Sequence, residues 1–130
     1  MNFVKLELSS GGTYSYIDAS TIAMNILGAF LSAIGCHKSM YKEWALADKS
    51  DPQGKFGYSC GANIIFLEEE DNDIYLSDNY SEEEIPTRLK MSQEQFVMLL
   101  DDWQEKVCKR KPREVIIKYV DDQFFIETCD

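Results

Sequence analysis

The feature that most constrains this sequence is a helix signal over residues 92–107, where a cap and an apolar stripe fit together. Ser92-Gln93-Glu94-Gln95 matches a capping box: the Ser92 hydroxyl accepts from the Gln95 amide, and the Gln95 side chain returns to the Ser92 N–H. Apolar residues follow at helical spacing and form one stripe, namely Phe96, Leu99, Leu100, Trp103 and Val107. Pro112 prevents continuation. The stripe must therefore be buried by other elements.

Segments typical of β-strands surround this helix. The residues from Phe3 to Leu8 predict a first strand, which ends at a Gly11-Gly12 turn. Residues 63–68 and 74–76 predict a hairpin with an acidic tip, and residues 77–90 an acidic loop that contains Pro86. Two further β-rich runs, residues 115–120 and 123–128, predict a C-terminal hairpin that turns at Asp121-Asp122.

A second helix is predicted to begin at Asp18 or Ser20, either of which can cap it, and to end at Gly35. Apolar residues populate most of its faces, so we expect it to be the central helix of the core. Residues 41–47 fit either a strand or a helical turn, and residues 51–54 are typical of a turn.

This order of elements predicts an α+β fold, in which a mostly antiparallel sheet packs against one or two helices. The length of 130 residues favours a single domain over residues 1–130. The N-terminal residues lack the apolar core of a signal peptide, and no apolar run is long enough to cross a membrane. We therefore expect a cytoplasmic protein without a membrane partner. Four scattered cysteines are then predicted to be free thiols: Cys36, Cys60, Cys108 and Cys129.

Charge bears most directly on function. The net charge is −10, and residues 56–87 contain nine acidic side chains without a single Lys or Arg. Such a chain repels phosphate backbones, which argues against direct nucleic-acid binding, but it attracts basic proteins. Tyr75 and Tyr80, interleaved with these acids, are suited to anchor an interface. The predicted partner-binding residues are Glu68, Glu69, Glu70, Asp71, Asp73, Tyr75, Asp78, Tyr80, Glu82, Glu83 and Glu84. The alternative is a solvated loop that only keeps the protein soluble.

The sequence contains no motif that would carry catalysis or hold a cofactor or metal. His37 is the only histidine, so the sequence offers too few ligands for a typical zinc site. A nucleophilic mechanism would have to use His37 as its base, and the adjacent Cys36 is in a sequence context that matches no nucleophile motif. The loop that contains Gly54, Gly57 and Gly61 lacks a phosphate-binding motif. A calcium loop that began at Asp71 would require a glycine where Leu76 stands. We expect a protein that is not an enzyme.

Four stretches of the C-terminal half resemble the immunity proteins of bacterial polymorphic-toxin and contact-dependent growth-inhibition systems. They are Ile74-Tyr75-Leu76-Ser77, the acidic loop to Pro86, the helix of residues 92–107, and Lys111-Pro112-Arg113-Glu114-Val115-Ile116-Ile117. The resemblance covers residues 62–128 and implies a cytoplasmic antidote that binds one cognate toxin domain, often a nuclease. Because nuclease active sites are basic, an acidic surface can occupy them in place of phosphates.

Three other functions remain as alternatives. A nucleic-acid mimic that inhibits a DNA-binding enzyme needs carboxylates spread at phosphate-like intervals, whereas these acids are concentrated in one segment. A metal-dependent enzyme needs carboxylates that project from rigid strands into a pocket. A non-catalytic adaptor domain would carry the acidic segment only incidentally.

Overall fold

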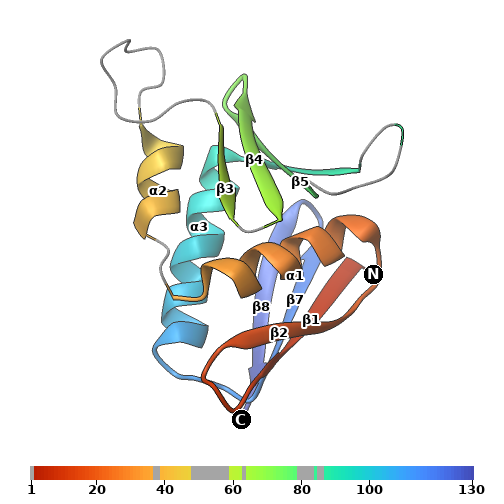
Figure 1. Cartoon of the computed structure of the whole chain (residues 1–130), viewed down its shortest axis with the longest axis vertical. Helices are drawn as coiled ribbons and strands as arrows, with labels where there is room; N and C mark the ends of the chain where they lie inside the picture. The colour runs from red at the N-terminus through yellow and green to blue at the C-terminus, as the bar shows by residue number, and fades with distance from the viewer. Residues whose placement is uncertain (1, 37–38, 48–58, 63, 79–83, 85–86) are drawn as a thin grey trace.

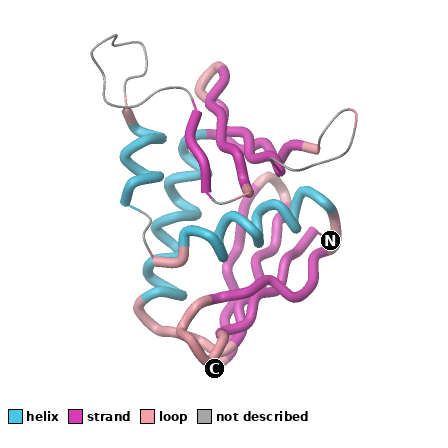
Figure 2. The backbone as a smooth tube through the Cα atoms, in the orientation of Figure 1, coloured by secondary structure: helices cyan, strands magenta, loops and turns pink. Residues whose placement is uncertain are grey.

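A computed structural model describes residues 2–36, 39–47, 59–62, 64–78, 84 and 87–130. The described residues form two antiparallel sheets of four strands each and three α-helices, which confirms the α+β class. Side chains from both sheets and all three helices join one cluster of buried residues. Figures 1 and 2 show helix α1 (Ile22–Ile34) lying between the two sheets.

The first sheet joins the two ends of the chain. Its strands lie in the order β2 (Tyr14–Ala19), β1 (Asn2–Leu8), β7 (Glu114–Val120) and β8 (Gln123–Cys129). The predicted first strand and C-terminal hairpin are thus confirmed. Strand β2 was not predicted, because a register shift opposite Lys5 and Leu6 disrupts its alternation and Tyr14 is its only buried residue.

The second sheet is a meander of consecutive strands. It contains β3 (Ser59–Ala62), β4 (Ile65–Glu70), β5 (Asp73–Asp78) and β6 (Arg88–Ser92). The predicted acidic hairpin is confirmed, but only Asp71 and Asn72 form its tip, where both residues have positive φ as a tight hairpin turn requires. The loop predicted for residues 77–90 was wrong at both ends. Strand β5 continues to Asp78, and β6 begins at Arg88 because burial of Leu89 and Met91 pairs it with β5.

Helix α1 has the central position that its sequence predicts. Leu27, Phe30 and Leu31 are completely buried, and the helix contacts strands of both sheets. Its cap is Thr21, whose hydroxyl accepts from the Met24 amide at 3.2 Å. The predicted caps were wrong because Asp18 belongs to β2 and the Ser20 side chain bonds the backbone of Phe3 instead.

Glycines mark two constraints on α1. The helix ends at Gly35, as predicted, where φ is +54°. In its middle, Gly28 allows a close approach to the first sheet: a Cβ there would lie 2.6 Å from Val4 Cγ2 and 2.9 Å from Tyr16 Cβ. The first sheet therefore limits the side chain at position 28 to a hydrogen atom.

Helix α2 (Ser39–Leu46) settles residues 41–46 as helical, and it packs against α3 (Gln93–Trp103). Lys42 Nζ lies 3.0 Å from Asp101 Oδ1, and the Gln93 side chain donates to the Ala45 carbonyl.

The capping box at the start of α3 and the buried stripe behind it are confirmed. A π-helical turn, Gln104–Cys108, extends α3. The Trp103 indole donates to the Gly35 carbonyl at 2.7 Å, which ties α3 to the end of α1.

The prediction of four free thiols was wrong, because Cys36 and Cys108 form a disulfide. They lie 72 residues apart in sequence, but the end of α1 meets the π-helical turn and brings their Cα atoms to 5.7 Å. Cys60 and Cys129 carry no disulfide. Within the described ranges, no helix is long and apolar enough to cross a bilayer. The predicted turn at residues 51–54 lies outside the described residues.

Candidate protein-binding surface

The outer face of the second sheet gathers four of the predicted partner-binding residues. Along β4 and β5 the side chains of Ile65, Leu67, Ile74 and Leu76 are buried on the inner face. The alternating residues Glu68, Glu70, Asp73 and Tyr75 therefore project from the opposite side. Glu68 pairs across the strands with Tyr75, and Glu70 with Asp73, so the four side chains are neighbours. We call this surface the acidic face.

The remaining predicted residues divide among other positions. Glu69 and Asp78 alternate with the four above, so the strand places them on the other side of the sheet. Asp71 is exposed at the tip of the hairpin, and Glu84 is exposed in the connection between β5 and β6. Tyr80, Glu82 and Glu83 lie outside the described residues. The structure thus brings together four of the eleven predicted residues on one surface.

Two bases that were not among the predicted site residues, Arg88 and Lys90, lie beside the acidic face. Arg88 Nη1 lies 3.5 Å from Glu70 Oε1 and 4.0 Å from Glu68 Oε1, and Lys90 Nζ lies 3.5 Å from Asp73 Oδ2. Both bases belong to β6, the neighbouring strand. Arg88 and Lys90 alternate with the apolar Leu89 and Met91. This alternation is the pattern in the sequence that indicates strand β6. Ion pairs this exposed contribute little, at most about 1 kcal/mol each, so a partner's bases can replace them.

Tyr75 shows what the acidic face can bind. Tyr75 is half-buried, and it lies on the outer side of β5 and not in the core. The guanidinium carbon of Arg88 lies 4.1 Å from the centroid of the Tyr75 ring, a cation–π contact. The Tyr75 ring and the carboxylates around it therefore already bind an arginine of the same chain. The same chemistry would accept an arginine of another protein.

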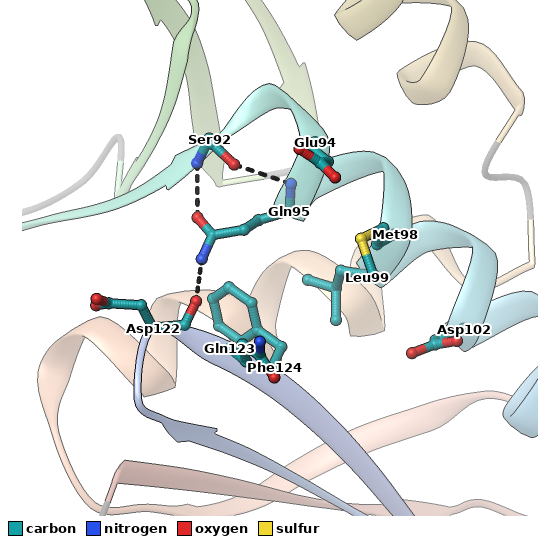
Figure 3. A pocket seen from close by; sticks show the side chains of 9 residues that line it. All are labelled: Ser92, Glu94, Gln95, Met98, Leu99, Asp102, Asp122, Gln123 and Phe124. Carbon is teal, nitrogen blue, oxygen red and sulfur yellow. Dashed lines mark hydrogen bonds between the residues drawn. The ribbon is translucent and has the colours of Figure 1, made fainter.

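A groove lies between α3 and the turn that joins β7 to β8 (Figure 3). Its volume is about 270 Å³, and its lining residues are Ser92, Glu94, Gln95, Met98, Leu99, Asp102, Asp122, Gln123 and Phe124. Gln95 fixes one end: its Oε1 accepts from the Ser92 amide at 2.8 Å, while its Nε2 donates to the Asp122 carbonyl. The capping box therefore also fastens the β7–β8 turn to the helix. This groove could not be predicted from the sequence, because its two walls come from distant parts of the chain.

The groove combines apolar and acidic groups. Met98 is 59% exposed, although it sits on a helix whose neighbouring stripe is buried. Three acidic residues, Glu94, Asp102 and Asp122, line the groove, and none of its described lining residues is a Lys or Arg. Asp122 Oδ1 accepts from the Tyr119 hydroxyl at 3.1 Å. Burial, and then the hydrogen bond and charge of Asp122, raise the pKa of Tyr119 above its usual value.

Catalytic and metal chemistry finds little support where side chains are described. No group of three or more His, Cys, Asp or Glu in those parts of the chain is placed to hold a metal ion. Cys36 is oxidised in a disulfide, and His37, Gly54 and Gly57 lie outside the described residues. Asp71 belongs to a two-residue hairpin turn, which is not a calcium loop.

Comparisons with other proteins do not extend this description. No protein-family model matches the chain, and no curated protein or solved structure is significantly similar to it. The resemblance to immunity proteins therefore stays a prediction. A functional interpretation must rest on the acidic face and the groove.

Proposed function

We propose that this protein has no catalytic activity of its own, binds a cognate toxin domain with a basic active site, and neutralises the toxin by covering that site with the acidic face. The observation that carries the proposal is the arrangement of Glu68, Glu70, Asp73 and Tyr75 on one outward-facing surface of the second sheet. A tyrosine ringed by carboxylates suits a surface rich in arginine and lysine. The toxin class itself comes only from the resemblance described above.

Binding would proceed in two stages with different physical causes. The net charge of −10 attracts a basic domain at long range and raises the rate of encounter, an effect that salt screens over about 8 Å at physiological ionic strength. At contact, bases of the toxin replace Arg88 and Lys90 as partners of the acidic face. Tyr75 is then buried against the toxin and slows dissociation.

The direct test is co-expression with the proteins encoded by the neighbouring open reading frames, as candidate toxins. We expect the toxin alone to arrest growth and co-expression to restore it, with a purified complex whose association rate falls as salt rises. Persistent arrest, with no binding between the purified proteins even at low salt, would refute the proposal.

A charge-reversed variant locates the surface. In Glu68→Lys/Glu70→Lys/Asp73→Lys, the association rate should fall by roughly tenfold or more because the attracting field is removed from the site of contact. The matched control Asp18→Lys/Glu43→Lys/Asp130→Lys changes the net charge equally at exposed positions away from the acidic face, and it should slow association less. Circular dichroism must show that both variants are folded. Equal rates for the two variants would mean that only net charge matters.

The tyrosine gives a separate readout. Tyr75→Ala should mainly raise the dissociation rate, since it removes contact area without changing charge. Ser77→Ala, which alters the next outward position of β5, should leave both rates close to wild type. An unchanged dissociation rate in Tyr75→Ala would show that the partner does not bury this ring.

The proposal also places the protein in the cytoplasm, where disulfides are uncommon. The Cys36–Cys108 disulfide lies at the end of α1 and contributes no residue to the acidic face. We therefore expect affinity for the toxin to be the same in the presence and absence of a reducing agent. A large loss of affinity on reduction would indicate that the protein acts in an oxidising compartment.

A further inference from the structure

We propose that the groove between α3 and the β7–β8 turn is a second contact for the basic partner and that it accepts one arginine side chain. This inference rests on the proposed function, because it assumes a basic protein partner. It adds a separate surface and a particular side chain to that function.

The size and floor of the groove suit a single side chain. Its volume of about 270 Å³ is just below the range of roughly 300–1,000 Å³ that is typical of sites for drug-sized ligands. Met98, Leu99 and Phe124 supply apolar surface. Long basic side chains bury their aliphatic stems against such surface while their charged ends stay near water. The occupant should therefore have an apolar stem and a charged end.

The charges determine the sign of that end. Glu94 and Asp102 stand four residues before and after Met98, which places all three along one side of α3. Asp122 lines the groove from the β7–β8 turn, but Figure 3 shows its backbone carbonyl turned toward Gln95 and its carboxylate directed away from Met98. Within the described part of the chain, neither Glu94 nor Asp102 has an ion-pair partner. The apolar floor is thus bordered by carboxylates that a cation would satisfy.

Arginine fits this border better than lysine. Its planar guanidinium donates two parallel hydrogen bonds to a carboxylate and stacks on aromatic rings, whereas the lysine ammonium is a compact, strongly hydrated charge. The groove offers both partners, carboxylates and the ring of Phe124. Arg88 makes the equivalent combination inside this protein, with Tyr75 and Glu70.

A second cavity connects the groove to the acidic face. It shares Ser92, Gln95 and Asp122 with the groove, and it is also lined by Asp73 and Lys90. Asp73 belongs to the acidic face, and Lys90 pairs with it. A partner seated on the acidic face can therefore extend an arginine along a continuous surface into the groove.

The test uses small probes and does not require the toxin. N-acetyl-arginine amide is titrated into ¹⁵N-labelled protein at low salt, with N-acetyl-lysine amide and N-acetyl-citrulline amide as controls. We expect amide shifts concentrated at α3 and the β7–β8 turn, with binding at least about fivefold tighter for arginine than for either control. Shifts spread over all acidic surfaces, equal binding of arginine and lysine, or no binding would each overturn the proposal.

Variants show whether the groove itself is responsible. Glu94→Gln/Asp102→Asn should weaken arginine binding by about fivefold, because it removes two carboxylates without changing the shape of the groove. Met98→Gln tests the apolar floor and should weaken binding by a smaller factor. Asp18→Asn/Glu43→Gln removes the same charge elsewhere and should have no effect. Equal weakening by this control would overturn the proposal.

The two proposals can fail separately. Arginine binding in the groove together with failed growth rescue would refute the toxin function and leave the groove as an arginine site. Growth rescue without arginine binding would refute the groove and leave the function intact.

Discussion

The two sheets differ in how the chain builds them. The first combines residues 2–19 with residues 114–129, whereas the second is a continuous meander over residues 59–92. The first sheet therefore needs contacts between the two ends of the chain, while the second needs only contacts between neighbouring strands. The Cys36–Cys108 disulfide joins a residue just after α1 to the residue that ends the π-helical turn before β7. It therefore links the two chain segments that lead out of the first sheet and back into it.

Charge content does not distinguish the sheets, but charge placement does. With its hairpin turn, each sheet contains six carboxylates and two bases. In the first sheet the bases lie on the central strands, where Lys5 pairs with Glu114 at 3.6 Å and Lys118 with Glu127 at 2.9 Å. In the second sheet both bases lie on the edge strand β6. The acidic run in the sequence therefore overstates how unevenly charge is distributed over the surface. The positions of the ion pairs indicate a binding face better than the charge along the chain does.

The largest effect should come from truncating Trp103, which connects α3 to the first sheet. Trp103 is completely buried, and its ring meets that of Tyr14 edge-on at 5.7 Å between centroids. Trp103→Ala should lower the free energy of unfolding by about 3–5 kcal/mol, measured by urea denaturation. Met98→Ala, on the exposed side of the same helix, should change it by no more than about 0.5 kcal/mol. Equal midpoints for the two variants would contradict the assignment of Trp103 to the core.

Removing the disulfide should have the next largest effect. It closes a loop that contains the whole second sheet, with 72 residues between its ends. In the chain-entropy account, a loop of this length stabilises the fold by roughly 4 kcal/mol, so Cys36→Ser/Cys108→Ser should lower the unfolding free energy by about that amount. Thiol titration of the denatured, unreduced protein should find two thiols. A count of four would restore the original prediction of free cysteines.

Filling the space at Gly28 should destabilise the contact between α1 and the first sheet. Gly28→Ala places a methyl group against Val4 and Tyr16, and higher helix propensity offsets only part of the strain. We expect a net loss of roughly 1–2 kcal/mol in a thermal or chemical melt. Asn25→Ala, at an exposed position of the same helix, should be neutral or slightly stabilising. A stabilised Gly28→Ala variant would show that the helix can move away from the sheet.

The smallest effect on stability should come from the surface ion pairs. Arg88→Met in the second sheet and Lys118→Met in the first should each cost no more than about 1 kcal/mol. Their effects on binding should differ, because only Arg88→Met uncovers acids on the acidic face. Association with a basic partner should become faster in Arg88→Met than in Lys118→Met. The same rate in both variants would remove the distinction drawn between the two sheets.

The sequence predicted the elements that local rules define. The capping box at Ser92, the buried stripe to Val107 and the two hairpins depend on spacing within one segment. Strand β2 and the Cys36–Cys108 disulfide depend on pairing between distant segments, which no local pattern reveals. These features could not be predicted from one sequence.

The candidate site was predicted in composition but not in geometry. The predicted hairpin is local, and its pairing places Glu68, Glu70 and Asp73 near Tyr75. Along β4, successive side chains point to opposite faces of the sheet, so Glu69 lies on the other side from Glu68. A count of charges along the chain does not show this separation. The bases of β6 and the groove beside α3 required the folded arrangement.

The disulfide also decides how the protein would respond to a mechanical load. Strands β1 and β8 run in the same direction on either side of β7, so their outer ends, marked N and C in Figure 1, lie at opposite ends of the first sheet. Pulling on those ends would shear the strands past one another and stress many hydrogen bonds together. Once the first sheet and α1 yielded, tension would pass from Cys36 to Cys108 through the sulfur–sulfur bond. The second sheet, with its acidic face, would carry no tension and could stay folded while the rest of the chain was extended.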